Sequence, residues 1–210
     1  MRSIWTVSLL LLLVRAGWAG PGRYLCELTP GPPVRARVYQ LTAGTRRAVG
    51  PEFLYRHRGK MASAADVDGD GCLDLLVLVY KSTRYDPTPG WRPFVFTLKE
   101  SRWVPKWLGS RVGRRLLEAA LVQTPTGVRL LTLEDFGAHR TGLTLYHWAG
   151  FGFWGEWTGK PGPPASGLKV GEGKGGSDEI SVSVGGRRLT YVFRDGGCVP
   201  VASLFREGKR

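Results

Sequence analysis

The chain has 210 residues, of which 30 are glycine and 14 are proline, and its formal net charge is +13. This size suits one domain or a short array of repeats, and the glycine, proline and scattered tryptophan favour many short strands joined by turns over long helices. Asparagine is absent, which excludes Asn-linked glycosylation.

The N-terminus predicts a signal peptide over residues 1–19. A short basic start leads into the apolar run Ile4 to Val14, and the small residues Gly17 and Ala19 suit signal peptidase, which would then cut before Gly20. A retained membrane anchor is the alternative, but the run is shorter than the roughly 20 residues of a spanning helix. The mature chain, 20–210, is expected to be one secreted, periplasmic or cell-envelope domain with a charge of +11 once Arg2 and Arg15 are lost.

The mature chain contains a degenerate repeat of the length of a propeller blade. Each unit begins with an apolar strand and a basic or glycine-rich turn, as in Val38–Leu41 and Leu143–Tyr146. The units span roughly 34–82, 91–135 and 142–185, with a partial unit at 187–204. The prediction is an all-β fold of degenerate β-propeller-like repeats, about four short strands each, in a small closed or partial propeller. Any β protein with glycine turns can yield hairpins of this kind, which is the competing explanation.

One motif carries recognisable chemistry, an acidic loop in the first unit. Its carboxylates stand at relative positions 1, 3, 5 and 9, with glycines at 4 and 6 that permit a tight wrap. Such a loop turns several oxygens toward one centre, as a calcium ion requires, and the acids would repel one another without a cation. The sequence therefore predicts Ca²⁺ as cofactor. The expected metal ligands are Asp66, Asp68, Asp70, the backbone carbonyl of Cys72, and Asp74.

An EF-hand is excluded because position 12 of the loop is Val77, within a β-rich run, rather than a glutamate on a helix. Over Met61 to Tyr80 the sequence instead resembles the FG-GAP or VCBS repeat of extracellular β-propellers, which carries Asp-x-Asp-x-Asp-Gly-x-x-Asp before an apolar strand. The resemblance implies a calcium-binding, secreted propeller. Such propellers usually close with seven blades, so a small ring, an open half-ring and a dimer that completes the circle all remain open for this chain.

Two further segments carry structural predictions. The best helix candidate is Val112 to Gln123, where several apolar side chains share a helical face. The C-terminal hairpin, Leu189 to Val201, is expected to pack beside the strand Val34 to Leu41, because this would hide two exposed edges. Three cysteines leave one unpaired, and Cys26 with Cys198 is the expected bridge.

The sequence has no nucleophile elbow, phosphate loop or closely spaced histidines, so it is not expected to be an enzyme. The predicted function is an exported, non-catalytic calcium-binding module for binding or structural interaction at the cell envelope. Its basic surface would meet an anionic envelope polymer or polysaccharide, or another protein. One alternative is a secreted hydrolase using Glu134, Asp135 and His139 beside the aromatic residues of 148–157. Another is a binder of nucleic acid or a different anionic polymer through its arginines and tryptophans, which export disfavours.

Overall fold

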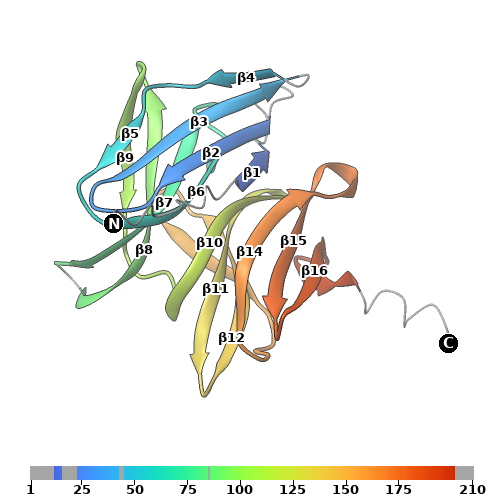
Figure 1. Cartoon of the computed structure of the whole chain (residues 1–210). Helices are drawn as coiled ribbons and strands as arrows, with labels where there is room; N and C mark the ends of the chain where they lie inside the picture. Colours follow the sequence, from blue (N-terminus) through green and yellow to red (C-terminus); the bar gives the residue numbers. More distant parts are fainter. Residues whose placement is uncertain (1–11, 16–22, 43–44, 85, 202–210) are drawn as a thin grey trace, which may run out of the picture.

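The computed structural model describes residues 12–15, 23–42, 45–84 and 86–201, and these form four antiparallel sheets in chain order (Figure 1). Together the sheets make a four-blade β-propeller arrangement that is not closed. The all-β repeat prediction is confirmed. Among the described residues no helix is long and apolar enough to cross a membrane.

The first sheet has the order β1–β2–β3, and its outer position is shared by two short strands, since both β4 and β5 pair with β3. Its strands are β1 (Leu12–Arg15), β2 (Arg23–Thr29), β3 (Val34–Thr42), β4 (Thr45–Ala48) and β5 (Phe53–Tyr55). Strand β1 falls within the expected signal peptide, whose other residues lie outside the described part. Cleavage before Gly20 would remove β1 and leave β2 as an edge.

The other three sheets each contain four sequential strands. The second has β6 (Gly59–Ala65), β7 (Asp74–Thr83), β8 (Asp86–Lys99) and β9 (Arg102–Leu108). The third has β10 (Arg115–Thr124), β11 (Gly127–Gly137), β12 (Arg140–Trp148) and β13 (Phe153–Thr158). The fourth has β14 (Ala165–Glu172), β15 (Asp178–Val184), β16 (Arg187–Arg194) and β17 (Gly197–Pro200), with a 3₁₀ turn η1 (Lys174–Gly176) before β15. The first strands of successive sheets, β1, β6, β10 and β14, contact one another around the centre.

The apolar run in strand β7 has no polar interruption because the strand is buried on both faces. Leu76 and Leu78 point into a core shared with the third and fourth sheets, whereas Leu75, Val77 and Val79 point into a core shared with the first. Since successive side chains alternate between the two faces of a sheet, a strand buried on both faces must be apolar throughout. This position between two cores holds the start of β7, and with it the end of the acidic loop.

The expected repeat units are out of phase with the sheets. The unit 91–135, for example, takes its first half from the second sheet, in β8 and β9, and its second half from the third, in β10 and β11. Sequence similarity marks the period of four strands without marking where each sheet begins.

Three expectations are wrong. Most of the helix candidate 112–123 lies in strand β10, because its apolar run is buried between neighbouring sheets, and short apolar runs fit strand and helix equally. The C-terminal hairpin does not pair with β3, which is flanked by β2 and by β4 and β5. All three cysteines are free, and Cys26 and Cys198 are buried in different cores.

Candidate metal centre

The acidic loop connects β6 to β7, and its two ends are anchored in the sheet where Ala65 pairs with Asp74. Asp66 and Asp74 are buried, whereas Asp68 and Asp70 lie on the exposed part of the loop. The loop thus begins and ends with a buried carboxylate and presents two more toward solvent.

Backbone amides hold the loop in its wrapped shape. The two carboxylate oxygens of Asp66 accept hydrogen bonds from the N–H groups of Gly69 and Gly71, each at 2.8 Å. Both glycines have positive φ, of 77° and 81°, which favours glycine at these positions. The Asp74 carboxylate accepts from the N–H of Val67 at 3.0 Å, so the first and last acids are both tied to the loop backbone.

The structure brings three of the predicted ligands together. One carboxylate oxygen each from Asp66, Asp68 and Asp74 lies within 4.8 Å of the other two. Asp70 lies outside this group, and its Oδ1 accepts a hydrogen bond of 2.8 Å from the N–H of Cys72. Three or four carboxylates on a tight loop are the hard oxygen donors that calcium prefers, so the residues present fit that ion by donor type.

A lysine that the sequence did not indicate reaches into the same group. The Nζ of Lys106 lies 2.6 Å from Oδ1 of Asp68, 3.0 Å from Oδ2 of Asp74 and 3.8 Å from Oδ2 of Asp70. Its side chain is only 13% exposed. The positive charge among these carboxylates is therefore supplied by the ammonium of Lys106.

The position of Lys106 follows from a β-bulge. In the pairing of β9 with β8, Trp107 faces Val95 and Pro105 faces Phe96, so Lys106 is the extra residue between them. Bulges redirect a side chain out of the regular alternation of a strand. No local sequence signal marks this bulge, and 32 residues separate Lys106 from Asp74, so sequence reasoning missed the contact.

The charged groups of the centre shift one another's pKa values. Burial raises the pKa of the Asp74 carboxyl above its usual value, against the opposing effects of the neighbouring Thr97, the Val67 N–H and Lys106. Burial also acts to raise the pKa of Asp70, but the Cys72 N–H and the Lys106 charge outweigh it, so this pKa is lowered. Burial acts to lower the pKa of Lys106, yet Asp68 and Asp74 raise it overall. Lys106 is therefore a stable cation at neutral pH.

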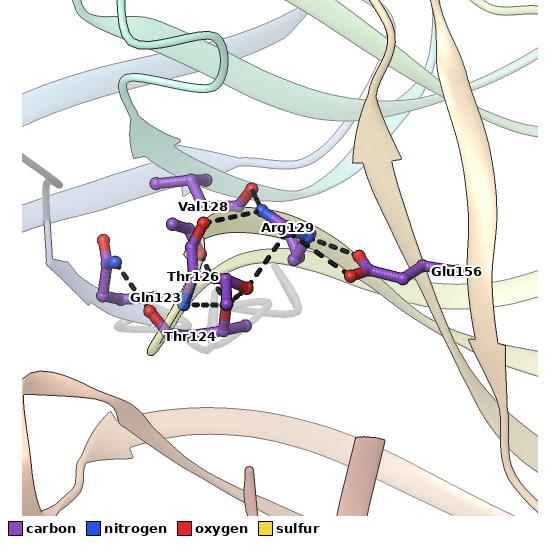
Figure 2. A network of polar contacts seen from close by, with 7 residues as sticks. Gln123, Thr124, Thr126, Val128, Arg129 and Glu156 are labelled. Carbon is purple, nitrogen blue, oxygen red and sulfur yellow. Dashed lines mark hydrogen bonds and ion pairs between the residues drawn. The ribbon is translucent and has the colours of Figure 1, made fainter. Parts of the chain in front are cut away.

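A cleft of about 590 Å³ lies between the acidic loop and the third sheet. Asp66 and Asp68 line one side, while Arg129 and Trp148 belong to the other. The guanidinium of Arg129 donates to Glu156 at 2.5 Å and to the hydroxyl of Thr126 at 3.1 Å, which holds this side chain in the wall of the cleft. Figure 2 shows these contacts. The cleft gives solvent and ions access to the exposed side of the acidic loop.

Known proteins add little to this geometry. No family model and no curated protein matches the sequence. A solved chain described as "Structure of a Xanthomonas Type IV Secretion System related protein" is similar over 87% of this chain and 90% of its own, at 13% identity and a TM-score of 0.28. A likeness at that score supports no argument about either protein. The propeller arrangement implied by the FG-GAP or VCBS resemblance rests on the four sheets themselves.

The residues of the hydrolase alternative lie in different surroundings. Glu134 is buried and accepts hydrogen bonds from the hydroxyls of Tyr146, at 2.5 Å, and Thr132, at 2.8 Å. Asp135 accepts from the N–H of Gly137 and lies 3.7 Å from Arg115, while His139 is exposed in the turn after β11. Neither Asp135 nor His139 shares a described cleft with Glu134. The Glu134 carboxylate thus forms hydrogen bonds within the third sheet.

Proposed function

We propose that this protein is an exported, non-catalytic β-propeller module whose acidic loop binds calcium and whose basic surface binds an anionic partner at the cell envelope. The observation that supports calcium is the convergence of oxygens from Asp66, Asp68 and Asp74 within 4.8 Å. The ion would be held by these carboxylates with Asp70 and the carbonyl of Cys72. Its charge would offset the repulsion among the acids and fasten the loop to the start of β7.

Thermal melts of the mature protein in calcium and in a chelator test this proposal. A ligand bound only by the folded state stabilises it, by about 2.7 kcal/mol at a free concentration one hundred times Kd. Calcium should raise the melting temperature of the native protein and leave that of Asp68→Ala unchanged. Asp195→Ala is the matched control, because the Asp195 side chain is 91% exposed and far from the loop in sequence. Equal melting temperatures of the native protein in calcium and chelator would refute calcium binding.

The outer face of the first sheet supports the anionic partner. Strand β3 alternates buried Val34, Ala36 and Val38 with exposed Arg35 and Arg37, so its arginines share one face. Further exposed arginines follow on and after β4 and β5, namely Arg46, Arg47, Arg56 and Arg58. Glu27 and Glu52 offset two of these charges, by ion pairs with Arg46 and Arg37. Arginines therefore outnumber the acids that pair with them on this sheet and in the segment after β5.

Retention on immobilised heparin and on DNA separates the kinds of partner. Binding through phosphates or sulfates weakens steeply with salt, so elution at a higher salt concentration indicates stronger binding through charge. We expect stronger retention on heparin, and reduced retention of a variant with Arg35→Gln and Arg37→Gln. Stronger retention on DNA would favour the nucleic-acid alternative, and elution of both at low salt would refute an anionic partner.

A further inference from the structure

We propose that Lys106 is a built-in competitor for the calcium site: its ammonium holds the acidic loop folded without metal, and calcium must displace it to bind. This inference rests on the proposed calcium function and concerns the regulation of that site. The supporting contacts are those of Nζ with Asp68, Asp70 and Asp74.

The ammonium and a calcium ion cannot share the centre. Two of the three carboxylates that converge, those of Asp68 and Asp74, are the ones bonded to Nζ at 2.6 and 3.0 Å. Calcium oxygens lie at 2.3 to 2.6 Å from the ion, so a calcium ion bound to both acids would stand within a few ångströms of Nζ. Two cations at that distance repel strongly when little solvent separates them.

A displaced Lys106 side chain can move toward Trp148. Its Nζ lies 5.9 Å from the centre of the Trp148 ring, and Trp148 lines the cleft beside the loop. An ammonium over an indole face retains part of its electrostatic stabilisation. Rotation of the side chain toward this cleft would therefore free the carboxylates without burying an unpaired charge.

The same contacts explain how the loop stays folded without metal. The N–H groups of Gly69 and Gly71 already hold Asp66, and Lys106 neutralises part of the remaining charge. Calcium binding then replaces the Lys106 ammonium with a metal ion in a loop that is already ordered. The affinity for calcium is lowered by the free energy needed to displace the Lys106 side chain. The protein therefore binds calcium only at concentrations high enough to outcompete this lysine.

The decisive comparison uses Lys106→Met, which keeps an unbranched side chain of nearly the same length and removes its charge. Lys169→Met is the matched control, since Lys169 is exposed on strand β14 of the fourth sheet and carries the same charge. Calorimetric titration with calcium should give Lys106→Met an affinity about tenfold or more above the native protein, with little change in Lys169→Met. In chelator, Lys106→Met should melt at a lower temperature than the native protein, and calcium should restore it.

The possible results separate this inference from the calcium proposal. If Lys106→Met and the native protein bind calcium equally well, the competition is refuted while calcium binding stands. If neither binds at millimolar calcium, the calcium proposal and the competition both fail. If Lys106→Met folds only with calcium, the inference is supported, and Lys106→Gln, which keeps a hydrogen-bond donor, provides a metal-free variant for the melts.

Discussion

Lys106 and Asp74 form an ion pair of 3.0 Å between strands that are not neighbours, because Lys106 reaches from β9 across β8 to the start of β7. The Asp74 side chain is fully buried, and it also accepts a hydrogen bond from the N–H of Val67. A buried carboxylate is tolerated only where its charge is matched, since it has lost its water. The pair therefore fixes both the loop and the bulge in β9.

Asp74→Asn should destabilise the metal-free protein by about 1.5 to 3 kcal/mol, because Lys106 loses its fully buried partner and keeps only Asp68 and Asp70. Urea unfolding in chelator measures this loss. Asp195→Asn, at an exposed acid, should change the free energy of unfolding by less than about 0.5 kcal/mol. A loss at Asp74 as small as that at Asp195 would mean that the pair does not stabilise the fold.

The Tyr146 hydroxyl predicts a pH dependence at the alkaline end. Burial and the Glu134 carboxylate raise the pKa of Tyr146 well above its usual value of 10.0. The phenol then stays neutral in the folded protein while it ionises in the unfolded chain, so the free energy of unfolding falls as the pH rises above about 10. Tyr146→Phe should reduce this slope between about pH 9 and 11, measured by urea unfolding at each pH.

Tyr146→Phe should also cost about 1 to 3 kcal/mol at neutral pH, because the buried Glu134 loses a hydrogen-bond donor. Tyr80→Phe is the matched control, since Tyr80 is 43% exposed. An unchanged alkaline slope in Tyr146→Phe would show that other groups govern the transition.

Gly109 lies against a buried ring and accepts no side chain. Its φ is 74°, and a Cβ placed there would lie 2.1 Å from Cε2 of Phe94, which is 1% exposed. We expect Gly109→Ala to cost about 3 kcal/mol, from backbone strain and overpacking together. Gly90→Ala, where a Cβ meets open space, should be close to neutral. Equal midpoints of thermal unfolding for the two variants would contradict this.

The three cysteines should differ sharply in reactivity. Burial raises the pKa of Cys198 to about 12 and raises the pKa of Cys26 further, so both stay as unreactive thiols. Burial and Asp70 also raise the pKa of Cys72, on the acidic loop, but this thiol is the most accessible of the three. Ellman's reagent should therefore label one thiol quickly in the folded protein and all three after unfolding, and Cys72→Ala should abolish the fast phase. A cross-linked peptide containing Cys26 and Cys198 would contradict the two separate cores.

The sequence by itself determined the class of the fold and the position of the acidic loop. Alternating and continuous apolar runs, such as Leu75 to Val79, are set by the two-residue period of a strand, so they predict strands directly. The loop from Asp66 to Asp74 is also local, because nine consecutive residues supply all its carboxylates and glycines. Local chemistry of this kind is readable without knowledge of the neighbours.

Only the tertiary structure decided which cation lies against the acidic loop, which cores the cysteines occupy and which conformation residues 115–124 adopt. Lys106 reaches the acids because a bulge in β9 redirects it, and the pairing across β8 brings it near Asp74. Cys26 and Cys198 fall in different cores, and strand β10 is extended because sheets bury both of its faces. These outcomes depend on contacts between residues far apart in the chain, and the energy of such contacts appears only when the sheets pack.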